Sequence, residues 1–321
     1  MGIVVRSEKV ADYPAIAETL ALAFARNGRL GAGEMMLVDT MRRDTRFDPE
    51  LALVAERDGR VVGHAVFSPY EIQLGTERAR GAMLAPLAVH PAFQRGGIGG
   101  ALLREGFARL KVQGIPFTFH MGVPEYYPRH GYDSHQFGHV CLRFAAEPLS
   151  NAVGMYEVRP FGPDDAETVC RLWREWHEGV PFAIVPGRHF LDWASPYEHV
   201  HSVVFVKGST VRGYLRYDRS RPARMPSFLA ADADVFGAML AYVKGLCQKV
   251  PEHFDVPLHP DAAVAAERVP GPFERMASTC SAGFLRVLDE SYAPIVRYRE
   301  GVKDGSGAPG ILGLSPVYDF D

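Results

Sequence analysis

The sequence predicts an α/β protein in which a unit of about 150 residues occurs twice. Residues 3–6 and 156–159 each have the apolar pattern of a short strand, followed at the same spacing by an aspartate and an amphipathic helical pattern. Farther along, residues 54–63 and 204–213 each have the pattern of two strands joined by a tight turn that contains glycine. Because both matches keep the same order and nearly the same offset, they indicate a duplication.

Composition and charge exclude several classes of protein. At 321 residues, with 47% apolar and 23% charged residues, the chain can form two folded domains. It has no run of 18 apolar residues and no signal-peptide core at its start, so we expect a cytoplasmic protein that does not enter a membrane. A net charge of −3 argues against a nucleic-acid partner. The four cysteines form no Cys-x-x-Cys pair, and we expect no metal.

Two loose stretches divide the chain. The small and polar residues 147–154 mark the boundary between the units, so we assign residues 1–148 to the first domain and residues 155–300 to the second. A glycine-rich stretch over residues 301–310 follows the last strand. Residues 301–321 are therefore expected to form a loop and a C-terminal tail.

The stretch with the clearest chemical meaning is a glycine-rich turn between a strand and a helix. An apolar strand over residues 83–89 is followed by several glycines and then by a helical pattern over about residues 98–112. The N-terminus of a helix offers free N–H groups and the positive end of the helix dipole, which suits a phosphate. Side chains at Gly97 and Gly99 would block the close approach of such an anion, and Arg95 can add a charged contact.

Three stretches of the first unit match motifs of one known family. Residues 94–99, Gln-Arg-Gly-Gly-Ile-Gly, fit the pattern [Arg/Gln]-x-x-Gly-x-[Gly/Ala], and Leu-Ala-Val-His-Pro precedes them at residues 87–91. Residues 124–132 contain a Tyr-x-x-x-Gly-aromatic signature, and residues 51–67 have the pattern of two consecutive strands. Together they resemble the GNAT superfamily of N-acetyltransferases over about residues 3–145. The doubled unit resembles the tandem GNAT proteins of the enhanced-intracellular-survival type, without their sterol-carrier-like domain.

The resemblance implies a mixed sheet flanked by helices, duplicated, with the second copy degenerate. In this family the sheet splays between its fourth and fifth strands, here about residues 82–89 and 115–121, and acetyl-CoA enters the splay. The pantetheine arm would pair with the backbone of Leu87 and Val89 as an added strand does. The residues implied in acetyl-CoA binding are Leu87, Ala88, Val89, Gln94, Arg95, Gly96, Gly97, Ile98, Gly99 and Gly100.

The implied reaction is direct attack of a primary amine on the thioester. It requires a neutral amine, a polarised carbonyl and a proton for the departing thiolate. By the family match Tyr127, four residues before Gly131, is the general acid, whereas Tyr126 points elsewhere. A backbone N–H near Leu87 or Ala88 would polarise the carbonyl. The acceptor, a small molecule or a peptide amine, stays open.

The general base is less clearly indicated. No carboxylate lies between Glu77 and Glu105, so the fourth strand cannot supply the glutamate that many family members place there. His120 at the end of the fifth strand, Glu34, Glu71 and a chain of ordered water are the alternatives. A lone histidine on a strand is more often structural than a base.

The second copy lacks both parts of this chemistry. Residues 231–237 enter a helix, expected over residues 238–248, without a glycine-rich turn, and Asp232 and Asp234 would repel a phosphate there. Gly283 and Phe284 mimic the Gly131–Tyr132 pair, but Thr279 stands where Tyr127 would be. We expect the second domain to wall the acceptor pocket or to build a homodimer.

A metal site and two non-catalytic functions are the other interpretations of the sequence. His199 and His201 lie two residues apart, but no third metal ligand occurs at a useful spacing. The alternative to an enzyme is a non-catalytic module that binds an acyl-CoA and reports it through the second domain. A scaffold whose glycine turn holds no ligand is the third possibility.

Overall fold

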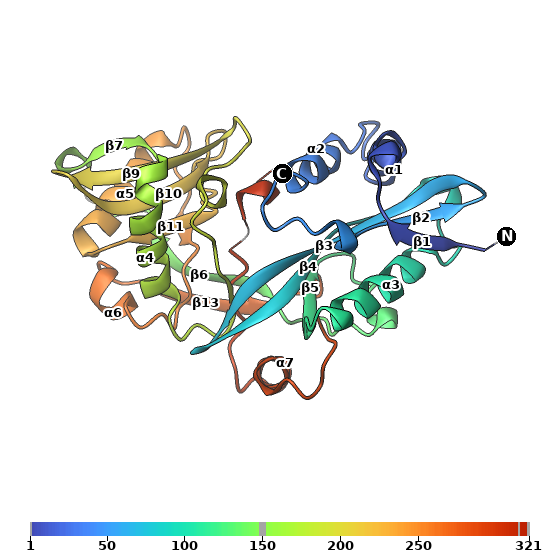
Figure 1. Ribbon diagram of the computed structural model, residues 1–321. Helices are drawn as coiled ribbons and strands as arrows, with labels where there is room; N and C mark the ends of the chain where they lie inside the picture. The colour runs from blue at the N-terminus through green and yellow to red at the C-terminus, as the bar shows by residue number, and fades with distance from the viewer. Residues whose placement is uncertain (1, 148–151, 314, 320–321) are drawn as a thin grey trace.

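The computed structural model describes residues 2–147, 152–313 and 315–319, and the domain boundary expected at residue 148 lies outside these ranges. Figure 1 shows two lobes, one formed mainly by the first half of the chain and the other by the second half. Each lobe places helices against a sheet, so the α/β class predicted from the sequence is confirmed. None of the helices in the described ranges is both long and apolar enough to cross a lipid bilayer.

The larger sheet belongs mainly to the first half. Its order is β1-β2-β3-β4-β5-β14, and the short β8 pairs with β3. Helix α1 packs on β3 and β4, α2 packs on α1, and α3 packs on β2, β3 and β4 beneath the sheet (Figure 1). The elements are β1 (Val4–Ser7), α1 (Tyr13–Ala23), α2 (Ala32–Met41), β2 (Ala52–Arg57), β3 (Arg60–Leu74), β4 (Glu77–Val89), α3 (Ile98–Val112), β5 (Phe117–Met121) and β8 (Ala183–Ile184).

Strands β4 and β5 separate after a very short contact. They run parallel and pair only at Ala82 with Thr118 and Met83 with Phe119. Beyond Met83, β4 continues to Val89 while still paired with β3 on its other side. The sheet is therefore open between β4 and β5, in the place that the sequence predicts.

The second half repeats the arrangement with a wider opening. Strands β11-β10-β9-β7 form one sheet, and β12 lies in a separate three-stranded sheet. The elements are β7 (Glu157–Pro160), α4 (Ala166–His177), β9 (Val200–Lys207), β10 (Thr210–Asp218), β11 (Ser227–Ala230), α5 (Ala233–Leu246), β12 (His253–Val256) and the short α6 (Ala265–Arg268). Helix α5 begins five residues earlier than expected because Asp232 accepts a hydrogen bond from the Val235 N–H and caps it.

The two halves exchange strands. Strand β14 (Gly283–Val287), near the end of the chain, pairs antiparallel with β5 of the first half. In return β6 (Gly138–Ala145), from the first half, lies between β12 and β13 (Glu274–Thr279) of the second half. Each half thus completes its β structure with a segment from the other, so the large sheet and the three-stranded sheet both join distant parts of the sequence, whereas the β11-β10-β9-β7 sheet lies within the second half.

An aromatic cluster fills the junction between the lobes. Phe117 and Phe119 on β5 contact Phe182 with ring centroids 6.1 and 5.2 Å apart, and Phe182 in turn contacts Phe137 and Tyr298. Tyr298 lies on α7 (Ala293–Asp304), so the loose stretch expected from residue 301 begins only after Asp304. Gly305, with φ of 78°, ends the helix there.

Candidate functional site

The turn that leads into α3 has the backbone geometry of an anion site. Arg95 and Gly97 have positive φ values of 62° and 80°, and Gly97 is the N-cap residue of the helix. No side chain caps this end, because glycine has none, so the first N–H groups of α3 are left without an intrahelical partner. Residues 94–97 are exposed, whereas Ile98, Gly99 and Gly100 are buried. The turn at residues 94–97 is therefore open to solvent and leads directly into a helix end that no side chain caps.

The two buried glycines allow side chains from the β5–β6 connection to approach the helix. A side chain at Gly99 would collide with the hydroxyl of Tyr126. A Cβ atom at Gly100 would lie 3.0 Å from Cε1 of His130 and 3.3 Å from Nη1 of Arg104. The sequence prediction that Tyr126 points away from the position of Tyr127 agrees with this placement: its hydroxyl lies against the first turn of α3.

Positive charge gathers around the same turn. Arg129 stacks on the Tyr126 ring at 4.7 Å from its centroid and donates a hydrogen bond from Nε to the Tyr126 carbonyl oxygen. Burial and the positive charges of Arg129, Arg104 and Arg286 lower the pKa of His130. Arg286, on β14, donates to the carbonyl oxygen of His130. A multiply charged anion at this turn would be stabilised by all of these groups.

The open edge of β4 carries unpaired backbone groups. The N–H of His90 donates to the carbonyl oxygen of Val62, so the hydrogen-bonded pairs of the β3–β4 ladder are His90–Val62 and, two residues back, Ala88–His64. The backbone groups of Leu87 and Val89 consequently face the opening toward β5. The Val89 carbonyl oxygen accepts a hydrogen bond of 3.2 Å from the Gln94 side chain, which ties the strand end to the glycine turn. Ala88 directs its own N–H toward β3.

Tyr127 lies at the far side of this opening, surrounded by aromatic rings. Its ring centroid is 3.9 Å from His120, 5.6 Å from Tyr132 and 5.2 Å from Phe284. Burial raises the pKa of its hydroxyl well above the usual range. The phenol is protonated at neutral pH, as an unperturbed tyrosine also is, so its hydroxyl carries the proton that a general acid needs. Sequence analysis missed the contribution of Phe284, which only the exchange of β14 brings to this position.

His120 lies directly beneath Tyr127 and is almost fully buried. Neither of its ring nitrogens has a hydrogen-bond partner in the described part of the chain. Burial lowers the pKa of His120 to about 3, so the imidazole is neutral and weakly basic. This environment argues against His120 as the base for an amine and suits a residue that positions the Tyr127 ring.

The other proposed bases are placed differently. Glu71 forms an ion pair with Arg78 and stands opposite Arg80 in the β3–β4 register. It lies six residues along β3 from Ala65, the residue opposite Leu87. At about 3.3 Å per residue this puts Glu71 roughly 20 Å from the stretch of β4 around Leu87, where the pantetheine arm is expected to pair. Glu34 lies in the first turn of α2, on the opposite side of the sheet from α3. The geometry thus removes Glu71 and leaves Glu34 and water as candidate bases.

The corresponding helix end in the second half is closed to anions. Asp232 caps α5 and also pairs with Arg212, while Asp234 lies exposed in the first turn. Thr279 is the last residue of β13 and pairs with Gly138. Among the described residues, no cluster of aromatic rings like that around Tyr127 surrounds it. His199 and His201 bond to separate partners, the Asp319 carbonyl oxygen and the Tyr217 hydroxyl.

Comparison with known proteins identifies the family. Residues 4–134 match the model of an acetyltransferase (GNAT) domain. The uncharacterized N-acetyltransferase YjhQ of Escherichia coli is 35% identical over 116 residues, which are 36% of this chain and 60% of YjhQ. The uncharacterized N-acetyltransferase YhbS of Escherichia coli is 31% identical over 132 residues, which are 41% of this chain and 74% of YhbS. The chain thus spans less than two thirds of the length of YjhQ.

Solved structures extend the likeness in fold to nearly the whole chain. A GCN5-related N-acetyltransferase from Kribbella flavida matches 90% of this chain and 72% of its own, with a TM-score of 0.66 and 19% identity. Eis1 from Mycobacterium abscessus matches 90% of this chain and 74% of its own, with a TM-score of 0.57 and 15% identity. These likenesses cover both halves and confirm the fold that the sequence predicts. The chain belongs to the GNAT family of N-acetyltransferases and carries two GNAT-like regions.

Proposed function

We propose that this chain transfers an acetyl group from acetyl-CoA to a primary amine, using a single site in the first half. The observation that carries the proposal is the arrangement around the β4–β5 opening. An uncapped glycine turn lies at one end, the backbone edge of Leu87 and Val89 that β3 does not pair lies along β4, and the Tyr127 ring packs on His120 of β5, the strand across the opening.

Acetyl-CoA binding follows from the first two features. The pyrophosphate takes the N–H groups of residues 96–100, with Arg104 and Arg129 close enough to add positive charge. The amide groups of the pantetheine arm pair with Leu87 and Val89 as a short added strand. The thioester then lies deeper in the opening, toward Tyr127.

The chemical step needs only groups of this chain and the two substrates. The amine lone pair attacks the thioester carbon, and a β4 backbone N–H stabilises the developing oxyanion. The C–S bond breaks as the tetrahedral intermediate collapses, and the Tyr127 hydroxyl gives its proton to the departing thiolate. The phenolate then regains a proton from solvent, which balances the proton that the amine releases. A neutral phenol is required for this role, and a tyrosine whose pKa is not lowered is neutral at pH 7.

The amine must lose a proton before or during attack. We assign this to Glu34 or to a water chain that leads away from the opening, since the environments of His120 and Glu71 argue against both. The pH profile of Glu34→Gln distinguishes the two: loss of the acidic limb supports Glu34, and an unchanged profile supports water.

Calorimetric titration with acetyl-CoA, followed by detection of free thiol with a panel of primary amines, tests the proposal. One site per chain with amine-dependent release of CoA is the expected result. Binding without thiol release from any amine would favour the acyl-CoA sensor instead. Absence of binding would overturn both, and two sites per chain would contradict a silent second half.

A further inference from the structure

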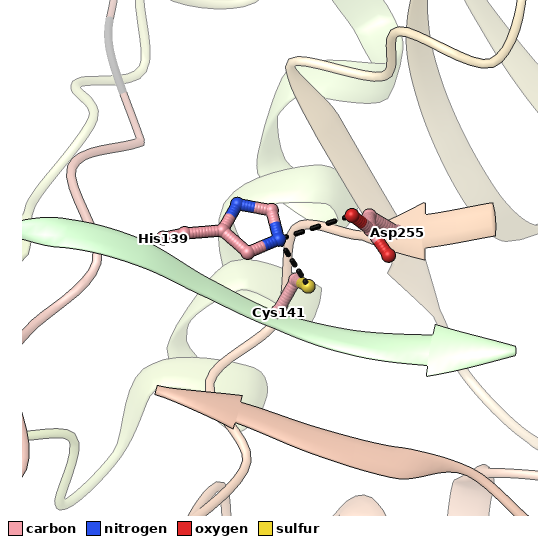
Figure 2. Close-up of side chains that lie close together, drawn as sticks. All are labelled: His139, Cys141 and Asp255. Carbon is pink, nitrogen blue, oxygen red and sulfur yellow. Dashed lines mark hydrogen bonds and ion pairs between the residues drawn. The ribbon is translucent and has the colours of Figure 1, made fainter. Parts of the chain in front are cut away.

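A second group of chemically reactive side chains lies far from the β4–β5 opening, where the exchanged strand β6 meets β12. His139 and Cys141 project from β6, and Asp255 projects from β12 toward the same point (Figure 2). The Nε2 atom of His139 is 3.0 Å from Oδ2 of Asp255 and 3.3 Å from Sγ of Cys141. The three donor atoms all lie within 4.8 Å of one another.

Strand geometry explains why these side chains meet. Alternate residues of a strand point to opposite faces, so Val140, Leu142 and Phe144 enter the core of the second half while His139, Cys141 and Arg143 share the other face, where Cys141 is covered by its neighbours. Asp255 stands directly opposite Arg143 in the antiparallel register and shares that outer face. The third residue of the set, Asp255, lies more than a hundred positions from the other two, which is why no sequence spacing revealed the cluster.

The distances fit a tetrahedral zinc site. With zinc bonds of about 2.0 Å to nitrogen or oxygen and about 2.3 Å to sulfur, tetrahedral angles separate the ligand atoms by about 3.3–3.5 Å. The two distances measured from His139 Nε2 are within a few tenths of an ångström of that range. Imidazole, thiolate and carboxylate are all ligands that zinc accepts, and three protein ligands leave one position for water.

Arg143 supplies the supporting contact that a carboxylate ligand needs. Its Nε donates to Oδ1 of Asp255 at 2.7 Å, and its Nη2 donates to Oδ2 at 2.8 Å. A metal on Oδ2 would replace only the second of these bonds, and the first would still hold the carboxylate in its rotamer. Such outer contacts orient metal ligands and typically contribute 10–100-fold to affinity.

The exposure of the three side chains fits a metal site better than a site in which Cys141 acts as a nucleophile. The His139 side chain is 50% exposed and that of Asp255 is 32% exposed, so an ion reaches them from solvent. Cys141 is only 2% exposed, beneath these two, where a substrate carbon cannot approach its sulfur. A small cation that sits above the sulfur needs no such approach.

We propose that His139 Nε2, Cys141 Sγ and Asp255 Oδ2 bind one Zn²⁺ ion. Binding replaces the thiol proton of Cys141, which leaves to solvent, by a zinc–sulfur bond. Because two ligands come from β6 of the first half and one from β12 of the second, the ion cross-links these two strands and stabilises their pairing. Its role is to stabilise the strand exchange, and it takes no part in acetyl transfer.

The test uses the full-length chain without a histidine tag, stripped with a chelator and dialysed. Zinc is titrated in competition with a chromophoric chelator, and thermal unfolding is followed with and without zinc. Variants His139→Ala and Cys141→Ser remove one ligand each. Matched controls are His135→Ala, an exposed histidine beside Ser134 in the segment before β6, and Cys247→Ser, a half-buried cysteine outside the cluster.

We expect one zinc per chain, a zinc-dependent rise in Tm, and a loss of affinity of at least about tenfold in both ligand variants. Both controls should bind as the parent does. Cobalt(II) should give a thiolate charge-transfer band that Cys141→Ser abolishes. Failure of the parent chain to bind stoichiometrically, or equal affinity in the folded ligand variants, overturns the proposal. Neither outcome depends on acetyltransferase activity.

Discussion

The N-termini of α3 and α5 hold equivalent places in the two halves and have opposite electrostatics. At α3 the cap residue is Gly97 with φ of 80°, no side chain covers the helix end, and Arg104 and His130 stand nearby. At α5 the cap residue is Asp232, whose carboxylate already accepts the Val235 N–H and pairs with Arg212. The same helix dipole thus faces solvent in one half and a fixed carboxylate in the other.

On the proposed function, this difference explains how a duplicated fold loses a site without losing its architecture. An aspartate cap satisfies the helix end from within the chain and stabilises the domain, whereas a glycine cap leaves that end to be satisfied by a ligand. The second half nonetheless contributes to the site of the first. Strand β14 brings Phe284 to 5.1 Å from His120 and 5.2 Å from Tyr127.

The largest effect is expected from Tyr127→Phe. Loss of the proton donor should lower turnover by about 10²–10⁴-fold while the affinity for acetyl-CoA stays close to that of the parent. Steady-state kinetics and calorimetry measure the two quantities separately. The control is Tyr292→Phe, which removes an exposed hydroxyl that donates to the Arg78 carbonyl oxygen. An unchanged rate in the Tyr127 variant would remove this residue from the acid role.

The next effect tests the difference between the two helix ends directly. Gly97→Val places a β-branched side chain at positive φ in the anion turn, which should weaken acetyl-CoA binding by about two orders of magnitude, or about 2.7 kcal/mol. Gly208→Val introduces comparable strain at φ of 63° in the β9–β10 turn of the second half. Only Gly97→Val should alter the affinity for acetyl-CoA measured by calorimetry. Equal losses in both variants would mean that strain, and not the ligand site, explains the result.

Much of this site could be predicted from local sequence. The strand, turn and helix at residues 83–112 are specified by apolar periodicity and glycines within thirty residues, and Tyr127 follows at a fixed distance before Gly131. The strand exchange could not be predicted, because pairing of β5 with β14 joins residues more than 150 positions apart. His120 and Phe284 acquire their surroundings from that pairing, and the zinc ligands depend on the reciprocal pairing of β6.

A smaller effect is expected where the second half supports the first. Phe284→Leu should lower kcat about tenfold by loosening the ring that fixes Tyr127, with little change in acetyl-CoA affinity. Phe228→Leu removes an equally buried ring from the core of the second half, away from Tyr127, and should lower Tm to a similar degree without lowering kcat. If kcat falls equally in both variants, general destabilisation accounts for the effect.

The smallest effect concerns the closed end of α5. Asp232→Ala removes the cap and should destabilise the protein by about 1 kcal/mol, measured by urea unfolding. Burial alone would raise the pKa of Asp232, but the Val235 N–H and Arg212 outweigh burial and lower it. A carboxyl whose pKa is lower in the folded state stabilises the protein at neutral pH and loses that contribution as pH falls through its folded pKa. The difference in stability between parent and variant should therefore shrink below about pH 4.

The control for this prediction is Asp234→Ala, at an exposed residue of the same helical turn, which should cost only a few tenths of a kcal/mol. Since an alanine cap restores no glycine turn, the Asp232→Ala variant should still bind one acetyl-CoA per chain; a second site would show that the aspartate alone had closed this helix end.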